Sequence, residues 1–385
     1  MNEFLGIKSI IYIVNVDWFF ISHRLPIALE AKKRGYKVTI ACNFTKHKEE
    51  LRDMGFNVIN IPFTRSGGGF LNELKTIIYI RRVIKEVKPS LVHAVTIKPV
   101  LYTGLALKTI TKNIPMVAAI SGLGYVFTAS NLRAKLTRFI ASLCYKVALT
   151  QKYKIVIFQN SSDDAILTRV ANLKCSDKAL IKGSGVDLSV YNSLAENNSD
   201  GIKVVMACRL LKEKGVYEYI EAAKQVKEHY LDTEFLLVGT PDLENPNTIE
   251  QTEIDRWVNG GVINYLGHRN DIPNVFADSN IVCLPSFYGE GVPKVLIEAA
   301  ACGRAIITTN NPGCKDAIID GVTGIAVPVR DSAALAMAII KLIEDSDLRN
   351  VMGQKGRLFA EQEFDVNSVV HKHLKIYNNL ISTVL

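Results

Sequence analysis

"SNIVCLPSFYGEGVPKVLIEAAACGRAIITT", residues Ser279 to Thr309, reads as a strand, a glycine-containing loop, a helix and a second strand. The apolar runs at its two ends are short and rich in Val and Ile, which is typical of buried parallel strands. Pro293 suits the first turn of a helix, because the N–H that proline lacks would be unpaired there. The stretch therefore predicts a β–α–β unit of a parallel sheet.

The same alternation of strand and helix patterns extends in both directions. It begins with "SIIYIVNV" (residues 9–16), weakens at "IKGSGVDLS" and "SLAENNSDG", and restarts with "IKVVMAC" (residues 202–208). We expect an α/β protein of two Rossmann-like, doubly wound domains, residues 1–185 and 186–365, which face each other across a cleft at the carboxyl ends of their strands. Residues 366–385 should form a helix that packs back towards the first domain.

Composition limits the class of protein. A chain of 385 residues is long enough for two domains with separate cores, and its 48% hydrophobic and 22% charged residues are typical of a folded protein. Its seven cysteines are scattered and show no metal-ligand spacing, so we expect reduced thiols and no metal cofactor. The N-terminus reads as a first strand and not as a secretion signal, and no apolar run is long enough for a spanning helix.

The net charge of +8 is unevenly distributed. Residues 1–190 contain 28 Lys and Arg against 12 Asp and Glu, whereas residues 191–385 contain 18 against 26. Between Val87 and Ser162 there are ten basic residues and no acidic one. A basic half is typical of proteins that meet nucleic acid, an anionic membrane surface or a phosphorylated ligand.

Two carboxylates frame the helix of the opening stretch. The loop "GEGV" brings backbone amides to the start of this helix, which is a favourable site for a phosphate. Glu298 follows Pro293 by five residues, about 7–8 Å along a helix axis, and a carboxylate suits a ribose diol better than a phosphate. Glu290, on the loop, suits the hydroxyls of a sugar on the far side of a diphosphate. The alternative is that both acids simply favour the helix dipole.

Two cations strengthen the ligand interpretation. In "MACRLLKEKGV", Arg209 stands at the end of a strand and Lys214 at the start of the next helix. A cation opposes the dipole at that end, so a bound anion would explain both residues. Two fixed cations can neutralise a diphosphate leaving group without a metal. Lys214 taken alone could equally be an exposed residue of a polar turn.

Together, residues 201–345 resemble the C-terminal domain of retaining glycosyltransferases of the GT-B fold, the large family four. The family motif of two glutamates separated by seven residues matches Glu290 and Glu298, and "GCKDAIIDGVTGIAV" (Gly313 to Val327) continues the match. The resemblance implies that Arg209 and Lys214 bind the donor diphosphate, Glu298 the ribose and Glu290 the sugar, and that "GHRNDI" near Arg269 lines the base. The implied donor site also includes the residues between the glutamates, Gly291, Val292, Pro293 and Lys294, and its catalytic residues are Glu290, Arg209 and Lys214.

The first half is similar to bacterial enzymes that extend glycans on polyprenyl diphosphate carriers. "WFFISHRLPIALEAKKRGYKVTIAC", "HAVTIKPVLYTGLAL" and "ISGLGYVF" carry this resemblance, which includes O-antigen and capsule transferases and the N-acetylgalactosaminyltransferases that act on undecaprenyl-diphosphate-bacillosamine. Many family members have a histidine where this chain has Ser121. Residues that would contact a lipid diphosphate acceptor are His23, placed in the loop after the first strand, and Arg24, Lys98, Ser121 and Gly122. His93, at a strand end, reads as a packed residue.

The basic stretch has two interpretations. "SNLRAKLTRFIASLCYKVALTQKYK", Ser130 to Lys154, mixes apolar residues with six cations and no acid, which favours an interfacial helix at the inner face of the cytoplasmic membrane. The alternative is a helix that faces the core and has a solvated outer face. "TRSGGGF" (residues 64–70) is a candidate loop near the acceptor.

These features favour a cytoplasmic, membrane-associated transferase that moves a sugar from a nucleotide donor, with UDP as the expected nucleotide, to a polyprenyl-diphosphate-linked saccharide. A Rossmann oxidoreductase is disfavoured because "GLGYVF" lacks the third glycine and does not follow the first strand. A nucleic-acid partner is disfavoured because no binding module is recognisable. A sugar-nucleotide 2-epimerase and a non-catalytic nucleotide-sugar-binding protein remain as alternatives.

Overall fold

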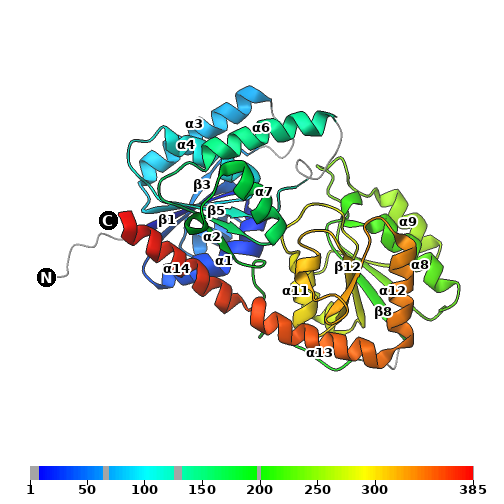
Figure 1. Cartoon of the computed structure of the whole chain (residues 1–385). Coiled ribbons are helices and arrows are strands. Elements are labelled where there is room, and N and C mark those ends of the chain that lie inside the picture. Colours follow the sequence, from blue (N-terminus) through cyan, green and yellow to red (C-terminus); the bar gives the residue numbers. More distant parts are fainter. Residues whose placement is uncertain (1–7, 64–68, 125–131, 197–200, 385) are drawn as a thin grey trace. The chain divides into compact units, whose positions relative to one another are not determined.

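The computed structural model describes residues 8–63, 69–124, 132–196 and 201–384, with side chains except those of Phe70 and residues 132–136. The chain divides into two compact units (Figure 1). The first contains the residues up to Ser184 together with those from Asn367 onward, and the second runs from Gly185 to Val366. Each unit is built on its own parallel sheet, which confirms the predicted pair of Rossmann-like domains.

The sheet of the first unit has seven parallel strands in the order β3-β2-β1-β4-β5-β6-β7. Its central strands β4 and β5 are buried along their whole length, because helices cover both faces of the sheet. The strands are β1 (Ser9–Val16), β2 (Lys37–Asn43), β3 (Asn57–Asn60), β4 (Leu91–Val95), β5 (Met116–Ile120), β6 (Lys154–Phe158) and β7 (Lys178–Leu180).

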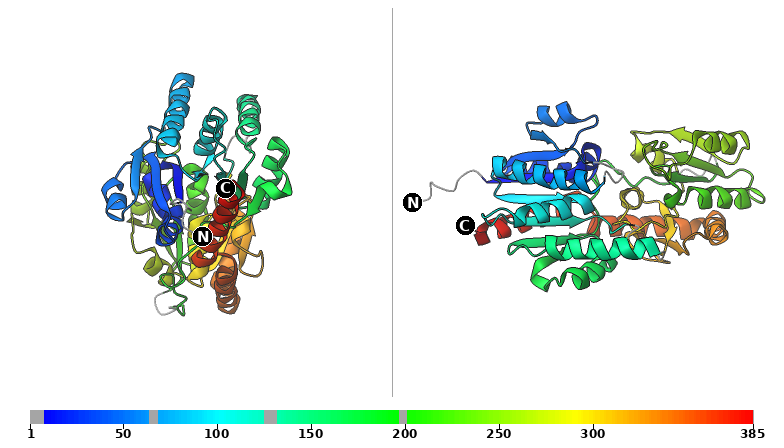
Figure 2. Two further views of the ribbon diagram at one scale, coloured as in Figure 1. Left: turned by 90° about the vertical axis from the view of Figure 1, so that its left-hand side faces the viewer. Right: turned by 90° about the horizontal axis from the view of Figure 1, so that it is seen from above.

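The helices of the first unit lie on both faces of this sheet. Figure 1 shows α1 and α14 on one side and α3, α4 and α6 on the other, and Figure 2 shows α3, α4 and α6 side by side. The helices are α1 (Asp17–Lys33), α2 (Lys48–Asp53), α3 (Phe70–Val87), α4 (Ile97–Lys108), α6 (Leu132–Ala148), α7 (Ser161–Ala171) and α14 (Val366–Val384). Chain-distant contacts attach α14: Tyr377 lies beside Tyr12 of β1 and His93 of β4.

The sheet of the second unit has six parallel strands in the order β10-β9-β8-β11-β12-β13. The strands are β8 (Lys203–Ala207), β9 (Glu234–Val238), β10 (Asn264–Gly267), β11 (Ile281–Leu284), β12 (Ala305–Thr309) and β13 (Gly324–Val327). The helices are α8 (Val216–Lys227), α9 (Gln251–Asn259), α10 (Ile272–Ala277), α11 (Lys294–Ala301), α12 (Ser332–Glu344) and α13 (Ser346–Glu363).

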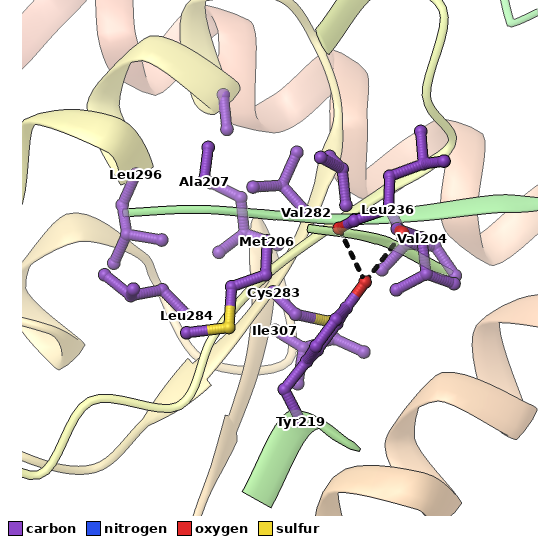
Figure 3. Packing of buried hydrophobic residues seen from close by; sticks show 14 of the residues in the cluster. Val204, Met206, Ala207, Tyr219, Leu236, Val282, Cys283, Leu284, Leu296 and Ile307 are labelled. Carbon is purple, nitrogen blue, oxygen red and sulfur yellow. Dashed lines mark hydrogen bonds between the residues drawn. The ribbon is translucent and has the colours of Figure 1, made fainter. Parts of the chain in front are cut away.

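The core of the second unit forms where α8 and α11 pack on the central strands. Figure 3 shows Met206, Cys283 and Ile307 from three neighbouring strands packed together, with Tyr219 of α8 entering beside them. The Tyr219 hydroxyl lies 2.8 Å from the carbonyl oxygen of Val204 and 3.0 Å from that of Leu236. These contacts satisfy the one polar atom that burial of this ring would otherwise leave without a partner.

Several helices begin at residues whose side chains cap them. The carboxylate of Asp331 accepts from the amide of Ala334 at 2.8 Å at the start of α12, and Asp345 does the same for Leu348 at the start of α13. Asn160 caps α7 through the amide of Asp163 at 2.8 Å. Such caps satisfy amide groups that have no partner within the helix.

No helix within the described ranges combines the length and the apolar character that a membrane span requires.

We predict opposite outcomes for two helical glycines changed to alanine. A Cβ on Gly104 of α4 would lie 2.4 Å from the carbonyl oxygen of Ala148 at the end of α6, whereas a Cβ on Gly356 of α13 would meet nothing closer than 3.7 Å. Gly104→Ala should therefore lower the free energy of unfolding by about 1–3 kcal/mol through overpacking. Gly356→Ala, the control, should leave it unchanged or raise it by roughly 0.5–1 kcal/mol. Urea denaturation measures both, and equal effects would contradict the close approach of α4 and α6.

Candidate functional site

The loop between β11 and α11 carries the first predicted carboxylate. Helix α11 begins at Lys294, so Pro293, with ψ at 126°, stands one residue before it and not inside its first turn. Gly291, Val292 and Pro293 are buried, whereas Lys294 is half-buried. No side chain caps the start of α11, and the amide of Leu296 in its first turn donates to the carbonyl oxygen of Pro293 at 3.1 Å.

The ion pair between Lys214 and Glu290 joins two of the predicted site residues. Lys214 follows β8 and Glu290 follows β11, and these strands are neighbours in the sheet. The Lys214 Nζ lies 2.6 Å from Oε2 of Glu290, and both side chains are about 15% exposed or less (13% and 15%). The hydroxyl of Ser286 donates to Oε1 of Glu290 at 2.6 Å. One carboxylate is therefore held by a cation on one oxygen and a hydroxyl on the other.

Close backbone approaches bring these loops together. Gly215, directly after Lys214, has φ of 83°, and a Cβ there would lie 2.2 Å from the carbonyl oxygen of Pro285. Gly313, in the loop after β12, has φ of 86°, and a Cβ there would lie 2.1 Å from the carbonyl oxygen of Gly291. Only glycine combines this left-handed backbone with such close packing. The loops after β8, β11 and β12 are thus packed against one another at the carboxyl edge of the sheet.

Arg209 leaves the same edge of the sheet. It stands two residues after β8, its side chain is half exposed, and Nη1 lies 3.4 Å from Oδ2 of Asp242 in the loop after β9. This long ion pair at the surface contributes little free energy, since such pairs rarely exceed about 1 kcal/mol.

Glu298 lies one turn along α11 and is buried, with 9% of its surface exposed. The hydroxyl of Tyr191 donates to Oε1 at 2.8 Å, and Nζ of Lys294 lies 3.6 Å from the same oxygen. Burial raises the pKa of the Glu298 carboxyl, while Lys294 and Tyr191 act in the opposite direction. This carboxylate is more deeply placed than a solvated residue at a helix start.

Arg269, expected near the nucleotide base, is held by its own loop. It follows β10, and its guanidinium forms two parallel contacts with Asp271, Nε to Oδ1 at 2.7 Å and Nη2 to Oδ2 at 2.6 Å. Both side chains are exposed. No contact of the described residues joins Arg269 to Lys214 or Glu290.

The structure corrects the placement of His23 in the first unit. The sequence prediction put this residue in a loop after the first strand, but α1 begins at Asp17, directly after β1, and His23 lies inside this helix. Its ring stacks on Phe19, with centroids 4.0 Å apart, and Nδ1 lies 3.2 Å from the Phe19 carbonyl oxygen. The early helix start explains the error, since the aromatic run from Trp18 to Phe20 has no helical signature of its own.

Arg24, expected to contact the acceptor diphosphate, is buried, with 2% of its surface exposed. It lies among Tyr12, Tyr377 and the buried histidines of β4 and α14, and Nη1 donates to the carbonyl of His23 at 2.8 Å. Burial lowers the pKa of the guanidinium to about 10. Arg24 therefore belongs to the packing under α14.

His93 lies beside this cluster and is fully buried on β4, which confirms that it is a packed residue. Its Nδ1 lies 2.5 Å from the Tyr377 hydroxyl. Burial is the main cause that lowers its pKa well below the usual range, and the nearby Arg24 charge adds to it. His93 is therefore neutral at physiological pH.

Lys98, Ser121 and Gly122 keep positions near strand ends of the first unit. Lys98, at the start of α4 after β4, pairs with Glu73 of α3 at 2.9 Å and is partly exposed. Ser121 follows β5, and its buried Oγ meets no hydrogen-bond partner in the described part of the chain. Gly122 has φ of 105°, which favours glycine at this turn. The candidate loop "TRSGGGF" lies outside the described residues except for its last two positions, as does the start of the stretch from Ser130.

Among the described residues, no group of three His, Cys, Asp or Glu side chains is placed to hold a metal ion.

Sequence reasoning missed two residues that hold the predicted carboxylates. Ser286 stands four residues before Glu290, and its role follows only from the fold of the loop. Tyr191 is 107 positions away from Glu298. Neither carries a signal in the sequence alone, because a lone serine and a lone tyrosine in irregular segments match no motif.

Both halves of the chain match families of glycosyltransferases. Residues 193–359 match the family described as "Glycosyl transferases group 1", and residues 9–160 match "Glycosyl transferase 4-like". The N,N'-diacetylbacillosaminyl-diphospho-undecaprenol alpha-1,3-N-acetylgalactosaminyltransferase of Campylobacter jejuni is 30% identical over 374 residues, which cover 94% of this chain and 96% of that protein. The UDP-Gal:alpha-D-GlcNAc-diphosphoundecaprenol alpha-1,3-galactosyltransferase of Escherichia coli is 23% identical over 362 residues, 90% of each chain.

Solved structures share the fold. Sucrose-phosphate synthase from Thermosynechococcus elongatus superposes with a TM-score of 0.81 at 20% identity, covering 98% of this chain and all of that one (100%). Anabaena Alr3699/HepE in complex with UDP gives a TM-score of 0.76 at 18% identity, covering 97% and 100%. With the Campylobacter enzyme 30% identical over nearly the whole length, these matches show that the protein is a glycosyltransferase of the GT-B fold and belongs to group 1, the family-four type.

Proposed function

We propose that this enzyme transfers a hexosyl or N-acetylhexosaminyl group from a UDP-sugar to a polyprenyl-diphosphate-linked saccharide during cell-surface glycan synthesis. The named activities of the Campylobacter and Escherichia coli relatives support this choice of acceptor, and the UDP complex of a structural neighbour supports the nucleotide. The observation that carries the proposal is the contact of Lys214 with Glu290 beside the start of α11.

In this proposal the donor diphosphate binds at the start of α11. The uncapped amides of this helix donate hydrogen bonds, and its dipole favours negative charge. Lys214 and Arg209 supply the cations, both from the loop after β8. As the bond between sugar and diphosphate breaks, these groups stabilise the charge that builds on the departing oxygen, so no metal is required.

The resting ion pair explains how one carboxylate serves the donor sugar. Before the donor binds, Lys214 neutralises Glu290 at 2.6 Å. An arriving diphosphate competes for the lysine, and Ser286 still holds Oε1 of Glu290, so Oε2 becomes available to accept hydrogen bonds from sugar hydroxyls. Attack of the acceptor hydroxyl on the same face of the sugar, with retention of configuration, follows from the family to which the chain belongs.

The first unit supplies the proposed membrane contact. On α6, Phe139, Leu143 and Val147 stand four residues apart and are 70%, 56% and 42% exposed. Helix α3, on the other side of α4, exposes Leu71 and Ile78. A helix with an exposed apolar stripe amid lysines and arginines is more typical of contact with an anionic leaflet than of a face exposed to water. We infer that the enzyme works at the cytoplasmic face of the inner membrane.

The epimerase and the non-catalytic binding protein are less well supported. The two relatives described above are both named as transferases.

Replacing Lys214 or Glu290 by alanine should lower kcat by about two to three orders of magnitude, the usual loss for a group that stabilises transition-state charge. The matched control is Lys224→Ala on α8, which breaks the exposed ion pair with Glu221 and should leave kcat unchanged. A coupled assay that detects the released UDP measures kcat for all three variants. Near-normal turnover in both site variants would contradict the assigned roles.

The reaction itself is tested by incubating the enzyme with a panel of UDP-sugars and short polyprenyl-diphosphate-linked saccharides. We expect free UDP and an acceptor heavier by one hexose or N-acetylhexosamine in the product mass spectrum. A changed sugar nucleotide with no extended lipid would instead indicate the epimerase.

The membrane contact is tested by cosedimentation with vesicles that contain phosphatidylglycerol. A Phe139→Ser and Leu143→Ser double variant should bind at least about tenfold more weakly, because each side chain contributes roughly 1.5–3 kcal/mol when fully buried in an apolar phase. The control carries Leu231→Ser and Leu243→Ser, which change leucines of the second unit that are 80% and 86% exposed. Equal binding of both double variants would exclude α6 as the contact.

A further inference from the structure

Among the residues that the structure describes, the contacts of the Glu298 carboxylate, the proposed ribose ligand, engage one of its two oxygens. Tyr191 donates to Oε1 at 2.8 Å, and Lys294 approaches the same oxygen at 3.6 Å. The contacts found among the described residues thus engage Oε1, and Oε2 can accept hydrogen bonds from a ligand. A carboxylate whose orientation is fixed on one oxygen presents the other in a defined direction.

The segment that carries Tyr191 is itself firmly held. Arg357 of α13 donates from Nη1 to the carbonyl oxygen of Tyr191 at 2.7 Å and to that of Ala301, at the end of α11, at 2.6 Å. The same arginine therefore ties this segment to the helix that bears Glu298. The amide of Tyr191 donates to the carbonyl of Asp187 at 2.9 Å.

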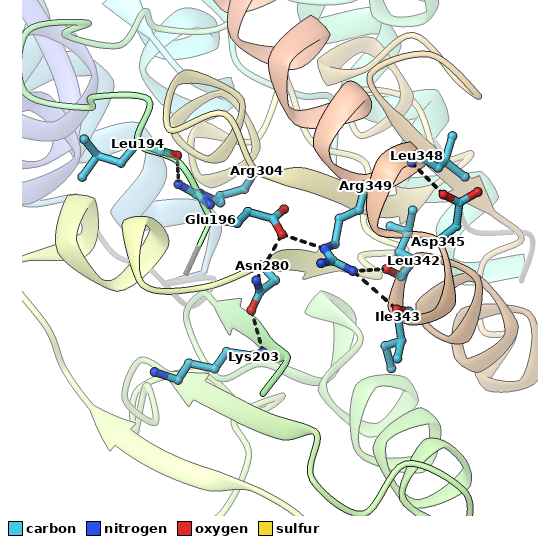
Figure 4. Close-up of polar contacts among 10 residues, drawn as sticks. All are labelled: Leu194, Glu196, Lys203, Asn280, Arg304, Leu342, Ile343, Asp345, Leu348 and Arg349. Carbon is cyan, nitrogen blue, oxygen red and sulfur yellow. Dashed lines mark hydrogen bonds and ion pairs between the residues drawn. The ribbon is translucent and has the colours of Figure 1, made fainter. Parts of the chain in front are cut away.

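A buried ionic network anchors the residues that follow Tyr191 (Figure 4). Oε2 of Glu196 accepts from Nε of Arg349 at 2.8 Å and from the side-chain Nδ2 of Asn280 at 3.2 Å. The side chain of Glu196 is 4% exposed and that of Arg349 is 2% exposed. Arg304 donates to the carbonyl of Leu194. A buried ion pair with these additional hydrogen bonds resists displacement, since breaking it leaves an uncompensated charge.

Electrostatics support a role for the Tyr191 hydroxyl beyond packing. Burial raises the pKa of Glu298 and therefore favours its neutral form, which is a poorer acceptor. The hydrogen bond from Tyr191 counteracts this effect by stabilising the ionised form. The neighbouring carboxylate in turn raises the pKa of Tyr191, after the larger effect of burial, so the phenol keeps its proton and remains the donor.

We propose that Tyr191 is a positioning residue for nucleotide recognition: its hydroxyl holds Oε1 of Glu298 and directs Oε2 to the ribose hydroxyls of the donor. This inference rests on the proposed function, because it requires a ribonucleotide at the start of α11. It adds a residue from outside the paired-glutamate motif to the donor site.

The test compares the affinities of UDP, 2′-deoxy-UDP and 3′-deoxy-UDP by calorimetry on the full chain. The wild type should prefer UDP over at least one deoxy analogue by about tenfold or more, the usual effect of a hydrogen bond to a charged group. Tyr191→Phe should weaken UDP binding by roughly three- to tenfold and leave the affinity for that deoxy analogue nearly unchanged. Glu298→Gln should remove most of the preference, and Tyr191→Phe should have little further effect in the Glu298→Gln background.

The matched control is Tyr230→Phe, which removes a tyrosine hydroxyl that donates to Glu344 near the surface of the same unit. This variant should bind all three nucleotides as the wild type does. If Tyr191→Phe weakens UDP and its deoxy analogues equally, or not at all, the positioning role is wrong. If Glu298→Gln keeps the full preference for UDP, the ribose assignment in the proposed function is wrong, so the two failures are distinguishable.

The pH profile provides a readout that loss of packing would not produce. The preference for UDP should fall as the pH drops through the raised pKa of Glu298, because the protonated carboxyl accepts hydrogen bonds poorly. In Tyr191→Phe this fall should move to higher pH, since a donor that stabilises the ionised form is gone. An identical profile in both proteins would overturn the proposal.

Discussion

The contact between Lys214 and Glu290 depends on how closely two loops of one sheet edge can approach. Gly215 makes room for the carbonyl of Pro285, and Gly313 makes room for that of Gly291. A side chain at either glycine would push apart the loops that carry the cation and the carboxylate. The two charges face each other at 2.6 Å because the backbone beneath them permits it. The donor chemistry proposed for this enzyme requires the same proximity, since diphosphate and sugar are joined by one bond.

The rest of the second unit supports this edge. Parallel strands place the carboxyl ends of β8 and β11 side by side, so residues that are 76 positions apart in the chain become neighbours. Helix α11, whose start has no side-chain cap, begins at the same edge, and Arg357 of α13 ties the segment of Tyr191 to the other end of this helix. The second unit therefore combines two cationic side chains and a helix start with two oriented carboxylates on one scaffold. That combination suits a nucleotide sugar, which offers a diphosphate flanked by hydroxyls on both sides.

The sequence predicted the alternation of strands and helices well, because Val- and Ile-rich runs and helical patterns are local signals. It also named Lys214, Glu290 and Glu298 as candidate ligands of a nucleotide sugar, because they stand near a strand end or a helix start, where a diphosphate and its flanking hydroxyls could bind. It failed where the outcome depends on tertiary packing. The sequence does not indicate that Arg24 is buried, because α14 returns from the far end of the chain to the cluster around this residue. Tyr191 was missed for the same reason, because its partner lies 107 residues away.

The central claim is that the start of α11 and Lys214 bind a diphosphate while Glu298 binds the attached ribose. The most direct measurement is a crystal structure of the protein soaked with UDP. We predict that the phosphate oxygens will lie within hydrogen-bond distance of Lys214 Nζ and the first amides of α11, and that a ribose hydroxyl will lie within the same distance of Oε2 of Glu298. UDP bound at another surface, or a ribose with no contact to Glu298, would contradict the account.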